Sequence, residues 1–165
     1  MAGNTGFSNS AEAAILDDAT VGLGRTLYLA LFKWTGTAGA GAGNSLNDDG
    51  TAPTNVAEVS ASGYSRLTVS SSHWAAAVGG APTYKVAPTG ATTYSWTATA
   101  AFGELCAWGL YTSATIGSGT YVCGGVLTTS GGTATSVTVN AGETFQFDSS
   151  NQLKVQLGDP SDTFA

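Results

Sequence analysis

The alternation of apolar and polar positions predicts short β-strands along most of the chain. Residues 26–34, TLYLALFKW, are almost continuously apolar, aromatic or β-branched, which predicts a core strand buried on both faces. Residues 140–159 alternate apolar with polar side chains around a turn at Ser149, Ser150 and Asn151, which predicts a closing two-stranded hairpin. Further strands are expected on either side of Gly63, at 83–86, 92–99 and 104–111, and within 117–130.

One helix is expected near the N-terminus, in the stretch FSNSAEAAILDDAT at residues 7–20. Asn9 stands at a capping position with Glu12 three residues later, as in a capping box, and Ala11, Ala14 and Ile15 form one apolar stripe. The pair at 17–18, two aspartates, is expected to end this helix.

The stretch 35–53 lacks any periodicity and consists largely of Gly, Ala, Asn and Asp. It closes with the turn pair Asp49–Gly50, so it is expected to be a long surface loop. Loops of this length in compact domains are often functional or make interfaces.

Many short strands without helices to connect parallel ones favour an all-β fold. We therefore expect an antiparallel β-sandwich, jelly-roll-like, with one short N-terminal helix. Residues 1–25 would form an N-terminal arm with the helix, and 26–165 a single β-sandwich domain. The 23 glycines among 165 residues suit the many turns that such a fold needs.

Charged residues make up only 10% of the chain, against roughly 25% in an average soluble domain, and the net charge is -6. No basic patch is available to neutralise phosphates, which argues against nucleic acid and anionic membranes as partners. No stretch approaches the ~18 apolar residues of a membrane span, and the first ten residues do not resemble a secretory signal. We expect a soluble protein made in the cytoplasm.

Candidate catalytic residues are few. His73 is the only histidine, and beside Trp74 it is expected to be an edge or loop residue rather than a base. Glu58, Glu104 and Glu143 would allow a pair of carboxylates for glycoside hydrolysis, but almost any β-protein would allow such a choice. The sequence therefore predicts a protein that is not an enzyme and has no cofactor.

Metal and disulfide sites are not expected either. Around Asp48–Asp49 the calcium-loop pattern fails, because Ser45 occupies its first position and Val56 the place of the bidentate glutamate. A turn is the better interpretation. Cys106 and Cys123 lie within apolar strand-like runs, so buried thiols are expected rather than a disulfide.

Most of the aromatic residues are expected in the core or in a subunit interface. The four tryptophans are Trp34, Trp74, Trp96 and Trp108. Trp34 and Trp74 flank loops, and with Tyr64 they are the residues that could stack on a sugar.

Taken in order, several stretches resemble a family of small bacteriophage virion proteins. The family has an amphipathic N-terminal segment, a first strand of the LYLALF type, a Gly-Tyr-x-Arg segment, a WG strand followed by GxLTTS, and a closing VxxGxxFxF element. The matching stretches here are 7–20, 26–32, 57–70, 102–130 and 137–157. The Gly/Ala-rich loop at 35–43, Cys106 and Cys123 depart from the pattern.

The resemblance implies a structural protein of the virion, since members of the family are variously tail-fibre, minor structural or head-decoration proteins. We expect a capsid decoration, or cement, protein that binds the major capsid protein or other virion proteins from outside the shell as a homo-oligomer, namely a trimer. The candidate interface residues are Phe7, Ile15, Leu16, Trp34 and Trp74. The alternative is a tail-fibre or receptor-binding protein that recognises a host glycan through Trp34, Trp74 or Tyr64.

Overall fold

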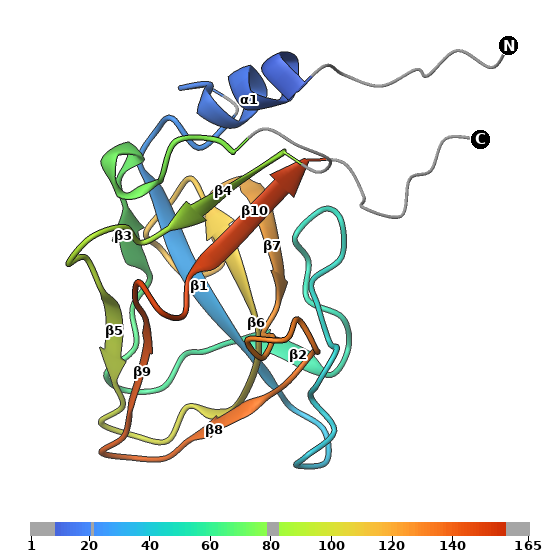
Figure 1. Cartoon of the computed structure of the whole chain (residues 1–165). Helices are drawn as coiled ribbons and strands as arrows, with labels where there is room; N and C mark the ends of the chain where they lie inside the picture. The colour runs from blue at the N-terminus through green and yellow to red at the C-terminus, as the bar shows by residue number, and fades with distance from the viewer. Residues whose placement is uncertain (1–8, 21, 79–82, 158–165) are drawn as a thin grey trace, which may run out of the picture.

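The computed structural model describes residues 9–20, 22–78 and 83–157, and this part of the chain is mostly β with antiparallel sheets and one short helix (Figure 1). In chain order the elements are α1 (Asn9–Asp17), β1 (Leu27–Trp34), β2 (Val56–Glu58), β3 (Leu67–Val69), the 3-10 helix η1 (Ser71–His73), β4 (Thr83–Ala87), β5 (Tyr94–Thr97), β6 (Gly103–Tyr111), β7 (Tyr121–Val126), β8 (Val137–Val139), β9 (Thr144–Phe147) and β10 (Leu153–Leu157). The predicted all-β, antiparallel class with one N-terminal helix is confirmed.

The largest sheet has six strands, with the long strands β1 and β6 at its centre. They pair antiparallel, with Leu29 opposite Leu110, and a β-bulge lies between Phe32 and Lys33. Each outer edge consists of two short strands in succession, β2 and β3 beside β1, and β7 and β8 beside β6. As the apolar run predicts, β1 has buried side chains on both faces.

Two further sheets have two strands each, β4–β10 and β5–β9. Together with the β6–β8 pair, they belong to one antiparallel pairing between two stretches of the chain. Thr83 lies opposite Leu157, Tyr94 opposite Phe147, and the β6–β8 pair then places Gly103 opposite Val139. The stretches 83–105 and 137–157 therefore run antiparallel to each other as a long ribbon with two breaks. Pro88 follows β4 directly, and a proline cannot donate to the ladder, which accounts for the first break.

The predicted C-terminal hairpin is wrong. Its two strands, β9 and β10, are present and joined by the expected turn, but β9 pairs with β5 and β10 with β4. The side-chain alternation determines which face of a strand is buried, and it does not determine which strand lies beside it. The neighbours of both strands come from residues about 50 to 75 positions earlier in the chain.

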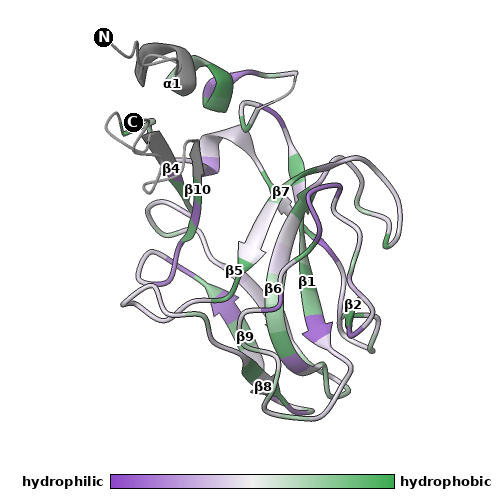
Figure 2. Cartoon of the chain, turned by 90° about the vertical axis from the view of Figure 1, so that its right-hand side faces the viewer, coloured by the Kyte–Doolittle hydropathy of each residue, from purple (hydrophilic) through white to green (hydrophobic). Residues whose placement is uncertain are grey.

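Apolar side chains form two clusters, one on each face of the large sheet. The larger cluster lies between this sheet and the small sheets, and includes Leu29, Leu110, Trp96 and Phe147. The smaller cluster lies on the other face and includes Phe32 and Leu46 among others. Figure 2 shows β4, β10, β5 and β9 on one side of β6 and β1. The side chain of Leu46 comes from the loop 35–55, so this loop covers the second face.

Helix α1 packs beside β4 (Figure 1). Leu16 belongs to the larger cluster, and Asp17 forms an ion pair with the buried Lys85 of β4. The helix ends at Asp17, as predicted for the aspartate pair. The side chains of the proposed capping box, Asn9 and Glu12, lie outside those that the structure describes.

Candidate functional site

The predicted interface residues lie in different environments. Phe7 lies outside the described residues. Leu16 is 4% exposed and Trp74 is 6% exposed, so neither offers a surface to a partner in this chain. The indole nitrogen of Trp74 also lacks a hydrogen-bond acceptor among the described residues. Ile15, at 37% exposure, and the half-buried Trp34 remain accessible.

Trp34 marks the point where β1 ends and the loop begins. Its indole Nε1 donates a hydrogen bond to the Thr37 carbonyl at 2.7 Å, which folds the loop back over the ring. A Cβ at Gly36 would lie 2.7 Å from two carbons of that ring, so the contact requires a residue without a side chain.

Glu104, on β6, holds the loop 35–55 against the sheet. Its carboxylate accepts hydrogen bonds from the Gly39 N–H at 2.6 Å, the Gly41 N–H at 3.1 Å and the Ser136 hydroxyl at 2.6 Å. The Ser136 hydrogen bond, together with those from the loop N–H groups, holds the pKa of Glu104 below its usual value. A carboxylate with a lowered pKa is ionised at neutral pH, so it suits an anchor and not a general acid.

Glu58 is likewise part of the framework. It pairs with the buried Arg66 through two hydrogen bonds, at 2.7 and 2.8 Å, and accepts a third from the Tyr64 hydroxyl at 3.2 Å. Arg66 also donates to the carbonyls of Ser113 and Ser118, at 2.8 Å each. This network ties β2 to the segment between β6 and β7.

The other titratable candidates also make local structural contacts. Glu143 accepts a hydrogen bond from the Asn140 N–H at 2.6 Å. Asp49 accepts from the Thr51 N–H at 2.9 Å, which confirms the predicted turn. The Nδ1 atom of His73 lies 3.1 Å from the Tyr94 hydroxyl. Across 9–20, 22–78 and 83–157, no three His, Cys, Asp or Glu side chains gather in a way that could hold a metal ion.

Both cysteines are free, as the sequence predicts. Cys106 belongs to the smaller cluster, whereas Cys123 packs against the larger one on the opposite face of the sheet. Burial raises the pKa of Cys106 to about 11, with a further contribution from the charge of Glu104, and burial raises that of Cys123 to about 12. Both thiols are therefore protonated at neutral pH and poor nucleophiles.

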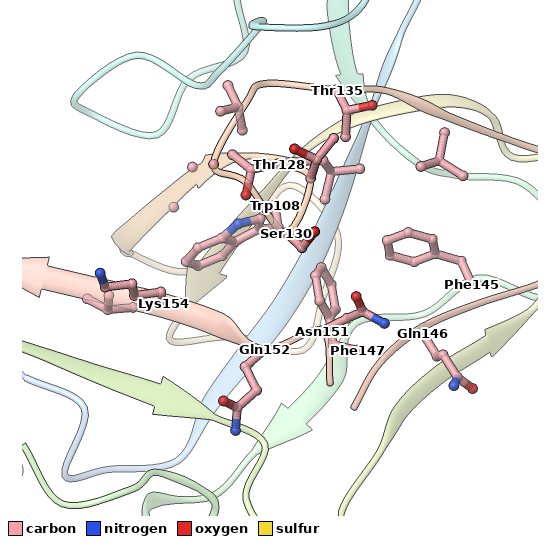
Figure 3. A pocket seen from close by; sticks show the side chains of 18 of the residues that line it. Trp108, Thr128, Ser130, Thr135, Phe145, Gln146, Phe147, Asn151, Gln152 and Lys154 are labelled. Atoms are coloured by element: carbon pink, nitrogen blue, oxygen red, sulfur yellow. The ribbon is translucent and has the colours of Figure 1, made fainter. Parts of the chain in front are cut away.

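A groove of about 950 Å³ lies between β7 and the β9–β10 turn. Trp108, half-buried Phe145 and Phe147 contribute aromatic surface, as Figure 3 shows. The remaining lining is mainly hydroxyl, amide and glycine: Gly124, Gly125, Thr128, Thr129, Ser130, Gly132, Thr135, Gln146, Ser150, Asn151 and Gln152. Lys154 is the charged residue in the lining, and among the described residues no carboxylate lines it.

The sequence pointed to Trp34, Trp74 and Tyr64 for sugar stacking, and none of these lines the groove. Trp108 was expected only as a core or interface aromatic, Thr128 and Ser130 only as part of the strand-forming stretch 117–130, and Ser150 and Asn151 only as turn residues. The signal available in the sequence was the density of hydroxyl and amide side chains in 128–135 and 149–152.

Comparison with known proteins gave no match with any protein-family model, any curated protein or any solved structure. Within the described ranges, no helix has the length and apolar character needed to cross a membrane.

Proposed function

We propose that this chain is a non-enzymatic structural protein of a phage virion that decorates the outside of the shell and stabilises it. The resemblance to small virion proteins supports the virion assignment. The observation that carries the decoration role is the loop 35–55, which is fixed on the sheet although it contains little apolar surface.

The loop is held at several points along its length. Glu104 binds its first part, the Asn44 side-chain amide donates to the Gly41 carbonyl at 2.8 Å, and the Tyr111 hydroxyl donates to the Gly50 carbonyl at 3.0 Å. Most of its residues are exposed, small and uncharged. A loop ordered in advance loses less conformational entropy on binding, so it can serve as a docking surface for shell subunits.

Two further parts of the proposal concern assembly and architecture. We propose a homo-oligomer, with a trimer as the first state to test, and Ile15 of α1 as a second contact because it is exposed beside buried Leu16. The ribbon formed by 83–105 and 137–157 supports a jelly-roll arrangement, in which a long antiparallel ribbon folds over itself.

The test adds purified protein to shells that lack it and measures co-sedimentation and shell melting. Binding to the shell raises its melting temperature by mass action if the proposal holds. Ala42→Glu introduces a charge on the loop, and Ala141→Glu introduces the same charge at an exposed position in the β8–β9 turn. Loss of binding with Ala42→Glu alone supports the loop as the contact. Failure of the unmodified protein to bind shells or shift their melting contradicts the decoration role.

The alternative function is a tail-fibre or receptor-binding protein with Trp34, Trp74 or Tyr64 in contact with a host glycan. The structure gives these residues little support, because Trp74 is buried and the Tyr64 hydroxyl is bonded to the Leu31 N–H at 2.9 Å as well as to Glu58. Whole-cell binding that is abolished by Trp34→Ala, with no binding to shells, would favour this alternative.

A further inference from the structure

The groove between β7 and the β9–β10 turn contains polar groups that have no hydrogen-bond partner among the described residues. Trp108 is 7% exposed, and its indole Nε1 has no hydrogen-bond acceptor among the described residues. The side chains of Thr128, Ser130 and Asn151 also make no hydrogen bond within the described part of the chain. These groups supply donors and acceptors that a ligand can use in place of water.

Two other amide side chains of the lining belong to the framework. The Gln146 amide donates to the Asp148 carboxylate at 2.9 Å, and the Gln152 amide donates to the Pro88 carbonyl at 2.7 Å. Figure 3 shows both amides turned away from Trp108. The polar groups that face the groove are therefore a specific subset of the lining.

Both walls of the groove are fixed by hydrogen bonds from backbone N–H groups. On one side the Asp148 carboxylate accepts from the N–H groups of Ser150 at 2.8 Å and Asn151 at 3.0 Å, which sets the position of Asn151. On the other side the Thr129 N–H donates to the Thr133 carbonyl at 2.8 Å, which closes the turn that carries Ser130. Groups held in place before binding lose little entropy when a ligand arrives.

The chemistry of this surface selects one class of ligand. A phosphorylated ligand would need more positive charge than Lys154 provides, and a lipid would need an enclosed apolar cavity. Neutral sugars present hydroxyls on their edges and C–H groups on their faces, which match neutral donors and acceptors beside aromatic rings. The volume of about 950 Å³ lies at the upper end of the roughly 300–1,000 Å³ of small-molecule sites.

We propose that the groove lined by Trp108, Thr128, Ser130, Asn151 and Phe145 binds a neutral oligosaccharide. It binds without cleaving, because glycoside hydrolysis requires two carboxyl groups beside the scissile bond and no carboxylate of the described residues lines the groove. This function is additional to shell decoration, and it places a sugar-binding surface on a different part of the molecule from the loop 35–55.

The test uses the isolated full chain, so its outcome does not depend on shell binding. A panel of neutral oligosaccharides is titrated into ¹⁵N-labelled protein, and the indole N–H signal of Trp108 and the side-chain amide signal of Asn151 are followed by NMR. At least one member of the panel is expected to shift both signals while the Trp34 indole signal stays in place. No new reducing ends are expected to form.

Two variants in the groove and one control outside it test where the sugar binds. Asn151→Ala is expected to weaken binding roughly tenfold, because hydrogen bonds to the ligand are lost from an exposed turn residue. Asn55→Ala changes the same residue type at an exposed position outside the groove and is expected to leave affinity unchanged. Trp108→Phe keeps an aromatic ring and removes the indole N–H.

The proposal is overturned if no member of the panel binds, or if Asn151→Ala and Trp108→Phe both bind as tightly as the unmodified chain. It is also overturned if the groove signals move when protein concentration is raised without sugar, because a second copy of the chain then occupies the groove beside β7. Cleavage of a bound sugar would contradict the absence of a hydrolytic site.

Discussion

The two faces of the six-stranded sheet are covered in different ways. One face is covered by strands and a helix, whose apolar side chains form the larger cluster around Leu29 and Trp96. The other face is covered by the loop 35–55, which contributes Leu46 and is otherwise held by hydrogen bonds to Glu104 and Tyr111. The first cover rests mainly on the hydrophobic effect, and the second depends on a few polar contacts. The two faces should therefore respond differently to mutation and to pH.

The largest effect is expected from Phe102→Ala on the first face. Phe102 is fully buried and packs edge-on against Tyr64, with ring centroids 5.9 Å apart. Removal of the ring should lower the free energy of unfolding by about 3–5 kcal/mol, measured by urea denaturation. Val137→Ala, at an exposed position of β8, is the control, and an equal effect of both changes would argue against this core.

The next largest effect is expected from loss of the Arg66–Glu58 pair, which joins the end of β2 to the residue before β3 at one edge of the six-stranded sheet. Arg66 also stacks over the Tyr111 ring at 4.1 Å, and Tyr111 belongs to the smaller cluster. Arg66→Met leaves Glu58 without its charged partner and should cost about 3 kcal/mol in unfolding free energy. The double variant Glu58→Met/Arg66→Met should recover part of that loss. A double variant that is less stable than Arg66→Met would show that the pair is not the cause.

A smaller and more local effect is expected from Leu46→Ala on the second face. The side chain is 9% exposed and belongs to a loop that can adjust, so the loss should be about 2 kcal/mol, the low end for a buried leucine. Amide hydrogen exchange should speed up in 35–55 while β1 and β6 keep their protection. If β1 and β6 lost protection to the same extent, the loop 35–55 would belong to the same cooperative unit as the strands and the helix on the first face.

The smallest effect is the loosening of the loop 35–55 on the second face at low pH. The pKa of Glu104 is lowered by its hydrogen bonds from Ser136 and the loop N–H groups, so its stabilisation is complete above its ordinary value of 4.5. That stabilisation is lost as the pH falls through the lower pKa of the folded state. Hydrogen exchange corrected for intrinsic rates, compared at about pH 5 and about pH 3, should show loosening of 35–55.

Glu104→Gln is the control for this pH dependence. The amide can accept only through its oxygen, so the loop should exchange faster already at neutral pH, and the additional loosening in acid should be smaller than in the unmodified chain. If the loosening of 35–55 in acid were the same in Glu104→Gln as in the unmodified chain, other carboxylates would cause it. Asp49 and Asp148 also have lowered pKa values.

The same contrast explains which features could be predicted from the sequence. The strand β1, the helix α1 and the all-β class follow from local patterns of apolar residues, and the structure confirms them. The pairing of β9 with β5 depends on contacts between distant residues, which the alternation of side chains does not encode. The anchoring of the loop by Glu104 was missed because a lone glutamate in a strand carries no signal about its partners.

The groove was missed for a related reason. Thr128, Ser130 and Asn151 are ordinary turn residues when considered one at a time, and only the folded chain brings them beside Trp108. Conversely, Trp74 was expected beside a loop, and the structure places it in the larger cluster. Position next to a loop in the sequence does not decide burial, because a loop can fold over its own flanking residues.

The central claim, that this chain is a decoration protein of a phage shell, is tested most directly by its copy number in the particle. Under this proposal the chain is present in a phage particle, so the purified particles would be analysed by quantitative mass spectrometry, with the amount of the chain expressed relative to the major shell protein. A ratio near one, or a simple fraction of it, is the predicted result because a decoration protein follows the repeat of the shell. Absence from the particle, or only a few copies per particle, would contradict the decoration role.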